Sequence, residues 1–440
     1  MTNDLIGRWA ALAFLEKILN DHMPLDQAFD QTCRQYGDRL SPQDRGFARH
    51  LGTVCLRHLG QLDAMINYCT PRKLTGRQKT VRNILRLGIT QILYMTAPAH
   101  AAVNCAVKMT DKQKSSSDRH AKGMVNAILR RIDREREKFR SDFSPLLNIP
   151  RWLKSNWQAR YGAAEVEKIA AVLLSEPPLD LSLKPDLDGE VWAEKLGGRL
   201  LASGSVRLEK AGDVRRLPGY GDGAWWVQDV AASQPARLLG AQPGDRVLEL
   251  CAAPGGKTAQ TAAKGCRVTA LDQSDRRLRR LRENMARLKL DCDVVTSDGA
   301  AYQPDQPFPF ILLDAPCSST GTLRRHPEVS RARGPKDIQA LADIQRRLLD
   351  AAVAMLAEDG VLVYCVCSMQ AEEGPDQIKA LLDRNGTVKR KEITAGELPG
   401  CGQAILPSGD VQTLPFHQPG PDGAGGMDGF FISRLIKTAG

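Results

Sequence analysis

From residue 240 onward, the sequence alternates short apolar runs with stretches of helical spacing, and this alternation restricts the possible folds strongly. Parallel strands need a long crossover connection, usually a helix, so the pattern predicts a parallel sheet with helices between its strands. The expected strands are Arg246–Cys251, Arg267–Asp272, Cys292–Ser297, Phe310–Asp314, Val361–Cys365 and Phe430–Ile436, and the clearest helix is Ala340–Ala357. The C-terminal part is therefore predicted to be an α/β domain of the nucleotide-binding type.

The first expected strand runs into a turn of small residues. This turn reads Cys251-Ala252-Ala253-Pro254-Gly255-Gly256-Lys257-Thr258. Glycines at a strand-to-helix turn let the backbone approach a ligand closely. A P-loop would need a glycine six residues before Lys257, where this chain has Cys251, and the dinucleotide pattern G-x-G-x-x-G is missing too. The turn therefore indicates a cofactor site and favours neither an NTPase nor a dinucleotide enzyme.

Carboxylates follow the next three strands. Asp272 closes the second strand, Asp298 follows the third, and Asp314 closes the fourth. A carboxylate after the second strand accepts hydrogen bonds from ribose hydroxyls, and one after the third can accept from an adenine amino group. Each could alternatively be a helix cap, but three in succession indicate a ligand crevice at the carboxyl edge of the sheet.

Two cysteines occupy the turns after the fourth and fifth strands. The segments are Asp314-Ala315-Pro316-Cys317-Ser318-Ser319-Thr320-Gly321 and Tyr364-Cys365-Val366-Cys367-Ser368. If these strands are neighbours, Cys317 and Cys367 lie close together beside the cofactor. A cysteine at a strand end is otherwise a small buried hydrophobe.

The N-terminal third carries the whole charge excess of the chain. Residues 1–150 hold 24 Lys/Arg against 14 Asp/Glu, whereas residues 151–440 hold 37 of each. Apolar stripes at helical spacing, as in Leu5 to Asn20, predict an all-α domain, with a helix that starts at Ser41-Pro42. Candidate phosphate contacts between the stripes are Lys73, Arg77, Lys114 and Arg119. A basic domain joined to a neutral one favours nucleic-acid binding, the alternative being a merely solvated basic face.

Several classes of protein are unlike this sequence. There is no apolar run of 18 residues and no basic-then-apolar leader, so neither a membrane span nor secretion is expected. Eleven scattered cysteines without a CxxC pair favour a reducing cytoplasm and argue against a zinc site, and we expect no bound metal.

The pattern of residues 148–225 predicts a small α+β connector with strands at 179–183 and 206–208. We expect its tryptophans to be packing residues.

Two resemblances follow from these motifs. The stretch Lys122 to Arg130 is similar to the last-helix signature of NusB-type RNA-binding domains. The segments Cys251 to Thr258, Asp314 to Gly321 and Tyr364 to Ser368, with Met427-Asp428-Gly429-Phe430-Phe431, resemble RNA cytosine-5 methyltransferases. Together they make the chain resemble the NusB-fused Sun/Fmu (RsmB-like) branch, which modifies small-subunit ribosomal RNA.

This resemblance implies S-adenosylmethionine as cofactor and a covalent mechanism. Cys367 would attack carbon 6 of cytosine, Cys317 would assist release, and Asp314 would contact the base or the methionine end of the cofactor. Cys365 stands where the family has Ser or Ala, so we favour a structural role for it. From its place in the glycine turn, we expect Lys257 to lower a thiol pKa or orient the base. The implied cofactor contacts are Cys251, Ala252, Ala253, Pro254, Gly255, Gly256, Lys257, Asp272, Asp298 and Asp314. The implied substrate is 16S rRNA or its small-subunit precursor, at the position that the family numbers as 967.

Three positions depart from the family pattern. Val366 stands in place of Thr, Glu249 in place of Asp, and the usual Trp after Val329 is missing. Two interpretations therefore stay open for Arg324, Arg325 and His326. They contact RNA, or they form a solvated surface. A DNA cytosine methyltransferase would use the cysteine after Pro316 and would not need a second one. Methylation of tRNA or another rRNA, and a non-catalytic ribosome-assembly factor, remain alternatives.

The sequence thus predicts three domains in a cytoplasmic monomer. These are an all-α NusB-like RNA-binding domain at 1–145, a small α+β connector at 146–225, and a Rossmann-like class I methyltransferase domain at 226–440.

Overall fold

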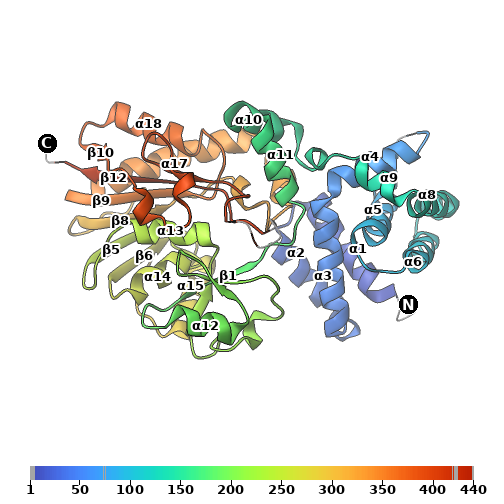
Figure 1. Cartoon of the computed structure of the whole chain (residues 1–440), viewed down its shortest axis with the longest axis horizontal. Coiled ribbons are helices and arrows are strands. Elements are labelled where there is room, and N and C mark those ends of the chain that lie inside the picture. Colours follow the sequence, from blue (N-terminus) through green and yellow to red (C-terminus); the bar gives the residue numbers. More distant parts are fainter. Residues whose placement is uncertain (1–4, 73, 75, 419, 421–424, 439–440) are drawn as a thin grey trace. The chain divides into compact units, whose positions relative to one another are not determined.

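The computed structural model describes residues 5–72, 74, 76–418, 420 and 425–438. The chain forms two compact units (Figure 1). Unit 1 extends to Leu174 and also includes His326–Ala332, and unit 2 comprises Ser175–Arg325 and the chain from Arg333 onward. Residues 146–174 pack with the N-terminal helices in unit 1. The domain boundaries expected at residues 145 and 225 stay predictions.

Unit 1 is helical, as predicted. Its main helices are α1 (Ile6–Asp21), α2 (Leu25–Tyr36), α3 (Pro42–Arg57), α4 (Leu59–Cys69), α5 (Lys79–Tyr94), α6 (Ala99–Asp111), α8 (Lys122–Arg134), α9 (Arg136–Ser141), α10 (Arg151–Tyr161) and α11 (Ala163–Val172). The apolar stripes of the first eight of these meet in one buried core that includes Phe14, Leu51, Leu85 and Leu129. The helical spacing predicted this packing because residues three or four apart share one face.

The start of α3 shows how local sequence fixes a helix boundary. The Ser41 hydroxyl accepts from the backbone N–H of Asp44 at 3.1 Å, and Pro42 occupies the first helical position. A hydroxyl cap satisfies an N–H that the helix cannot, and proline at this position loses no hydrogen bond. The predicted helix start at Ser41-Pro42 is confirmed.

A short segment from the C-terminal half of the sequence belongs to unit 1. Residues His326–Ala332 contain the single-turn helix α16 (Val329–Ala332). The buried carboxylate of Glu328 accepts from the backbone N–H of Leu25, the first residue of α2, at 3.2 Å. A negative group at a helix N-terminus is stabilised by the unpaired N–H groups there, so Glu328 anchors this segment on α2.

Unit 2 begins with a small antiparallel sheet. Its strands have the order β2 (Arg199–Leu200), β3 (Val206–Leu208), β1 (Leu179–Leu183), β4 (Trp225–Val227). Helix α12 (Gly189–Leu196) packs on this sheet, and its buried core includes Leu181, Val206 and Trp225. The two strands predicted in this segment are present, and Trp225 is a packing residue.

The large sheet of unit 2 has the order β10-β12-β9-β8-β5-β6-β7, with β11 paired to β12. The strands are β5 (Arg246–Leu250), β6 (Arg267–Asp272), β7 (Asp293–Thr296), β8 (Phe308–Asp314), β9 (Leu356–Val366), β10 (Val388–Arg390), β11 (Val411–Thr413) and β12 (Phe430–Lys437). Strands β5 to β9 are parallel, and β12 joins β9 antiparallel. Strand order therefore reverses between β5 and β8, and ligands bind outside the carboxyl ends of the strands at such a switch point.

Alternate residues of the central strands face two separate cores. Val247, Leu312 and Val363 pack with α13 (Val230–Leu238). Leu248, Ile311, Leu313, Leu362 and Tyr364 pack with α17 (Pro335–Met355) and α18 (Pro375–Arg384). Helices α14 (Gly256–Ala263) and α15 (Asp275–Leu288) pack on the strands β6 and β7, in a core that includes Ala270. Helices on both faces explain why these strands are apolar on both sides.

The structure corrects the bounds of one helix and of the strands β5 and β9. The helix expected at Ala340–Ala357 begins at Pro335, where the Asp337 carboxylate accepts from the Gly334 backbone N–H at 2.8 Å, and it ends at Met355. Strand β9 starts directly at Leu356, so its first residues had been assigned to the helix. Strand β5 ends at Leu250 instead of Cys251, because Cys251 adopts a left-handed conformation with φ 60°. No helix within the described residues is long and apolar enough to span a membrane.

Candidate active site

The turn after β5 lies at the switch point of the sheet. Cys251 and Gly255 both have positive φ values, 60° and 99°, and Gly255 directly precedes the first residue of α14. A Cβ atom on Gly255 would lie 2.9 Å from Leu281 Cγ, so this position requires glycine both for its conformation and for space. The first turn of α14 therefore presents free backbone N–H groups at the carboxyl edge of the sheet.

The predicted carboxylates lie at the same edge but in different environments. Asp272 is buried, accepts from the backbone N–H groups of Ala253 at 3.3 Å and Ser274 at 2.9 Å, and pairs with Arg277 at 3.0 Å. Asp298 is exposed and accepts from the backbone N–H of Ala300 at 3.0 Å. Asp272 thus holds the turn in shape, and Asp298 keeps acceptor capacity toward solvent.

Lys257 and Asp314 join the cofactor turn to the end of β8. Lys257 Nζ lies 2.6 Å from Asp314 Oδ2 and 5.1 Å from the centre of the Phe430 ring. Burial alone would lower the pKa of Lys257, but the Asp314 carboxylate outweighs burial and raises it. Lys257 is therefore a fixed cation in the site and does not serve as a base.

Glu249 lies in β5, below the cofactor turn. Its side chain is buried, and burial raises its pKa to about 8. This position departs from the family pattern, in which Asp is common. The pKa indicates that Glu249 carries a proton at neutral pH, so it adds no negative charge beneath the turn.

Cys317 and Cys367 form a close pair, because β8 and β9 are adjacent and parallel. Their sulfur atoms are 3.4 Å apart, and Cys367 Sγ lies 3.5 Å from Ser319 Oγ. The hydrogen bond between the sulfurs, followed by burial, raises the pKa of Cys317. The same hydrogen bond lowers the pKa of Cys367. Of the two, Cys367 is therefore the cysteine that loses its proton more readily, and the thiolate is the form that acts as a nucleophile.

The two other cysteines near the site have different properties. Cys365 is fully buried, and burial raises its pKa well above the usual value. Burial likewise raises the pKa of Cys251 to about 12. Both are therefore protonated thiols at neutral pH, in keeping with a structural role.

A buried carboxylate that the sequence analysis did not identify braces both cysteine loops. Glu373 accepts from the Ser318 backbone N–H at 2.7 Å, from Ser318 Oγ at 2.5 Å and from Ser368 Oγ at 2.5 Å. Ser318 and Ser368 directly follow the two cysteines, and Glu373 is completely buried. The only sequence signal was a serine after each cysteine, since buried hydroxyls need an acceptor.

A second buried network, also unforeseen, ties the loop before β12 to the Cys317 loop. Arg324 pairs with Asp229 at 2.5 Å and with Asp428 at 3.4 Å, and Arg325 also pairs with Asp428. Burial, and then the nearby Asp428, raises the pKa of Asp229 to about 6. The Gly429 backbone N–H donates to the carbonyl of Gly321 at 2.8 Å. The Met427 to Phe431 motif therefore contributes to the shape of the site.

These contacts bear on the predicted RNA contacts. The Arg324 side chain has no exposed surface, which argues against its direct contact with RNA, whereas the Arg325 side chain is 36% exposed. His326 Nδ1 lies 3.5 Å from Glu328 in unit 1. Lys73 lies outside the described residues, and only the backbone of Arg77 is described, in a single-turn helix.

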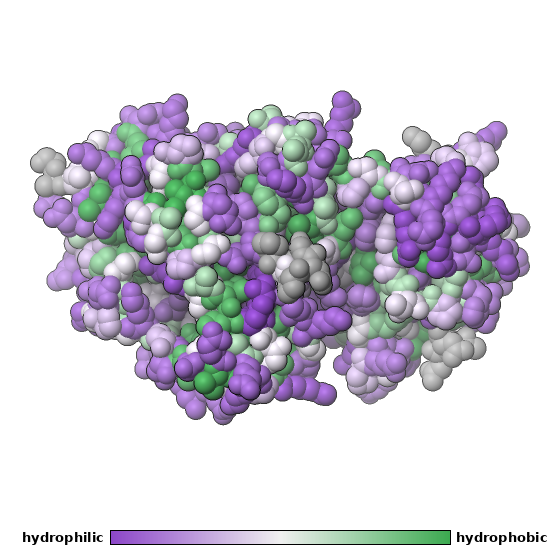
Figure 2. All heavy atoms as spheres, in the orientation of Figure 1, coloured by the Kyte–Doolittle hydropathy of each residue, from purple (hydrophilic) through white to green (hydrophobic). Residues whose placement is uncertain are grey.

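The basic surface of unit 1 is partly neutralised. Arg82 and Arg86 of α5 both pair with Asp63. Lys114 and Arg119 are exposed, and Arg119 donates to two nearby backbone carbonyls. Figure 2 shows hydrophilic side chains gathered over α8 and α9. The exposed cations of these helices are Lys122, Arg130, Arg134, Lys138 and Arg140.

Comparison with known proteins identifies both parts of the chain. Residues 236–436 match the family described as 16S rRNA methyltransferase RsmB/F, and residues 7–134 match the NusB family. Ribosomal RNA small subunit methyltransferase B of Pseudomonas putida is 35% identical over 98% of both chains. The protein of that name from Escherichia coli O157:H7 is 34% identical over 91% of this chain and 92% of its own length.

Solved structures show the same fold. The crystal structure of PH0851 covers 97% of this chain and 98% of its own, with a TM-score of 0.74 at 20% identity. NSun6 from Pyrococcus horikoshii covers 67% of this chain and 100% of its own, with a TM-score of 0.55 at 22% identity. The relatives match nearly the full length, and the switch point holds the glycine turn and the close cysteine pair. This chain therefore belongs to the RsmB/F family of 16S rRNA methyltransferases, with a NusB-family domain at its N-terminus.

Proposed function

We propose that this protein transfers the methyl group of S-adenosylmethionine to carbon 5 of a cytosine in 16S rRNA, through a covalent bond between Cys367 and carbon 6. The observation that carries the proposal is the 3.4 Å pair of Cys317 and Cys367 beside the ion pair of Lys257 and Asp314. A thiolate, a thiol and a fixed cation at the switch point of a methyltransferase sheet fit this chemistry.

The residues present fit S-adenosylmethionine. The free N–H groups at the start of α14, next to Gly255, can bind its carboxylate end. Asp272 and Asp298 lie at the ends of β6 and β7, where acceptors for ribose hydroxyls and the adenine amino group are needed. Asp314 is 31% exposed and can receive the cofactor's ammonium group on the side away from Lys257. When bound, the cofactor supplies an electrophilic methyl group.

The cysteine pair explains how the reaction begins. The Cys367 thiolate forms a bond to carbon 6 of the cytosine, and the electron pair of the ring double bond moves toward carbon 5. Carbon 5 then takes the methyl group. The target base has to be unstacked to reach a cysteine that is only partly exposed. The Lys257 cation also lowers the pKa of Cys367, and it partly offsets the neighbouring Asp314 carboxylate, which raises that pKa.

The same pair explains how the reaction ends. The proton on carbon 5 must leave so that the bond between sulfur and carbon 6 can break and return the thiolate. The negative Cys367 is what chiefly raises the pKa of Cys317, through a hydrogen bond and through its charge. Once Cys367 is bonded to carbon 6 it is neutral, so Cys317 can lose its own proton to solvent and then accept the carbon 5 proton.

The test is methyl transfer from labelled S-adenosylmethionine to unmodified 16S rRNA, by wild type, Cys367→Ala and Cys317→Ala. We expect 5-methylcytosine with wild type, none with Cys367→Ala, and an RNA adduct that resists denaturation with Cys317→Ala. Activity of Cys367→Ala together with an inactive Cys317→Ala would reverse the two roles and indicate the mechanism of a DNA methyltransferase. Binding of 16S rRNA without any transfer would favour an assembly factor.

We further propose that the protein acts as a monomer on rRNA in the cytoplasm. All eleven cysteines are free thiols, which fits a reducing compartment. Sedimentation of the protein with and without RNA would test the monomer.

A further inference from the structure

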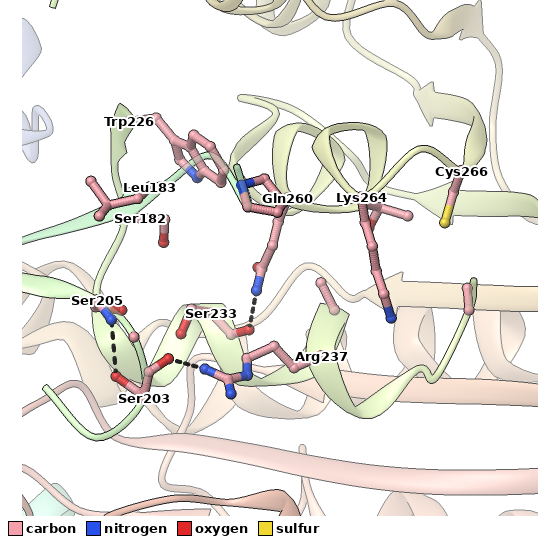
Figure 3. Close-up of a pocket in the computed structure, with 15 residues that line it drawn as sticks. Ser182, Leu183, Ser203, Ser205, Trp226, Ser233, Arg237, Gln260, Lys264 and Cys266 are labelled. Atoms are coloured by element: carbon pink, nitrogen blue, oxygen red, sulfur yellow. Dashed lines mark hydrogen bonds between the residues drawn. The ribbon is translucent and has the colours of Figure 1, made fainter. Parts of the chain in front are cut away.

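Unit 2 contains a cavity that is separate from the cysteine pair (Figure 3). Its volume of about 500 Å³ lies within the range typical of ligand sites. The small sheet contributes one wall through β1 and β4, and α13 and α14 contribute the other. None of the residues of the cofactor turn, Cys251–Thr258, or of the two cysteine loops lines it.

The cavity is cationic, because its lining contains two basic residues and no carboxylate. Arg237 of α13 and Lys264, directly after α14, extend into the same space (Figure 3). Neither has an ion-pair partner among the described residues, and Arg237 donates to the backbone carbonyl of Ser203. Arg237 remains exposed to solvent, and desolvation of part of its side chain lowers its pKa because no carboxylate offsets the lost water. The site is therefore suited to an anion.

The remaining wall is polar, rigid and flanked by an indole ring. Gln228 accepts from Trp226 Nε1 at 2.9 Å and from Ser182 Oγ at 2.8 Å. Gln260 donates to the backbone carbonyl of Ser233 at 2.8 Å. The hydroxyls of Ser182, Ser233 and Thr261 already donate within the protein, so their oxygens offer acceptor sites to a ligand. Sugar hydroxyls and base amino groups are donors of the matching kind.

We propose that this cavity binds one nucleotide of the RNA substrate, with its phosphate between Arg237 and Lys264 and its sugar or base against the Trp226 wall. The inference rests on the proposed function, which makes a polyanion the substrate. Residues 151–440 hold equal numbers of acidic and basic side chains, so a lining without carboxylates is a local feature. The bound nucleotide would lie away from the reacting base and would supply binding energy and register.

The experiment measures the affinity of full-length protein for 16S rRNA at several salt concentrations. The test variant is Arg237→Glu with Lys264→Glu. The control, Lys379→Glu with Lys389→Glu, changes the net charge equally at exposed lysines of unit 2 outside the cavity. Loss of two phosphate contacts should weaken binding about tenfold or more and reduce the salt slope by about 1 to 2, whereas the control should retain most of its affinity.

Further measurements separate this role from folding and from other ligands. Arg237→Lys keeps the charge and should retain the salt slope, and the double variant should keep wild-type affinity for S-adenosylmethionine. Equal losses in test and control variants, or wild-type RNA binding by the test variant, would overturn the proposal. Calorimetric titration with adenosine monophosphate and with inorganic phosphate distinguishes a free anion. If wild type binds either small ligand and the test variant loses that binding while its RNA affinity is unchanged, the cavity is a site for a free anion. That result would also overturn the proposal.

The RNA-affinity measurement does not depend on whether the protein is catalytically active. Wild type that binds rRNA but transfers no methyl group would contradict the proposed function, and the effect of Arg237 and Lys264 on RNA affinity would still decide the role of the cavity.

Discussion

Replacing Glu373 should reveal how far catalysis depends on a residue that touches neither cysteine. Its carboxylate is the common acceptor for the residues that follow the two cysteines. Glu373→Ala removes four hydrogen bonds at a fully buried position. The fourth comes from Gln345 Nε2, which keeps the Pro316 carbonyl as an acceptor. The Ser318 and Ser368 hydroxyls can turn to each other or to Thr320, at 3.2–3.3 Å. The Ser318 backbone N–H has no such alternative among the described hydrogen bonds.

The expected change in the free energy of unfolding follows from these hydrogen bonds. One orphaned buried N–H costs about 1–3 kcal/mol, and the space left by the side chain adds to it. We therefore expect Glu373→Ala to lower the free energy of unfolding by about 2–4 kcal/mol. A shift of either sulfur by about 1 Å would lower kcat on the order of 100-fold. Glu373→Gln keeps the volume and one acceptor oxygen, so its losses should be clearly smaller.

The assay combines kinetics with the reactivity of Cys367. We would measure kcat, the KM for S-adenosylmethionine, and the rate of Cys367 alkylation by iodoacetamide against pH. If the brace fails, Cys317 no longer donates well to Cys367, and the alkylation profile should move to higher pH while KM stays within about twofold. Glu372→Gln serves as the control. A folded Glu373→Ala variant with wild-type kcat and an unchanged alkylation profile would refute the positioning role.

Three further predictions concern the ion pairs and the close loop contact. Lys257→Met removes the cation of a 2.6 Å ion pair and should lower kcat more than affinity for S-adenosylmethionine, whereas equal losses would contradict its role at the reacting end. The raised pKa of Asp229, about 6, means that its contribution to stability is fully present below about pH 4 and is lost as pH rises through 6. The unfolding free energy of wild type minus that of Asp229→Asn should therefore fall by about 2–3 kcal/mol from pH 4 to pH 7 in denaturant titrations, and a constant difference would show that Asp229 does not titrate there. Gly321→Ala would place a Cβ atom 1.8 Å from the Gly429 carbonyl oxygen and should reduce kcat at least about tenfold, whereas Gly396→Ala, in open space, should change neither kcat nor Tm.

The sequence alone determined features that depend on local spacing. Apolar residues at helical spacing predicted the core of unit 1, because residues on one helix face are buried together. Short apolar runs followed by glycine or aspartate located β5, β6 and β8 to within two residues of their bounds. The pairing of Cys317 with Cys367 was also predictable, since neighbouring parallel strands end at the same edge. Boundaries were less certain where a helix passes directly into a strand, as at Met355 and Leu356.

Only the tertiary structure decided which charges are buried and what they hold. Arg324 reads as a surface cation in a basic run, yet it is enclosed by Asp229 and Asp428, which are distant in the sequence. Glu373 has no local pattern that marks it, because its partners are brought to it by the pairing of β8 with β9. The direction of the proton between the two cysteines likewise depends on burial and on neighbouring charges. These properties arise from contacts between distant segments, which local spacing does not encode.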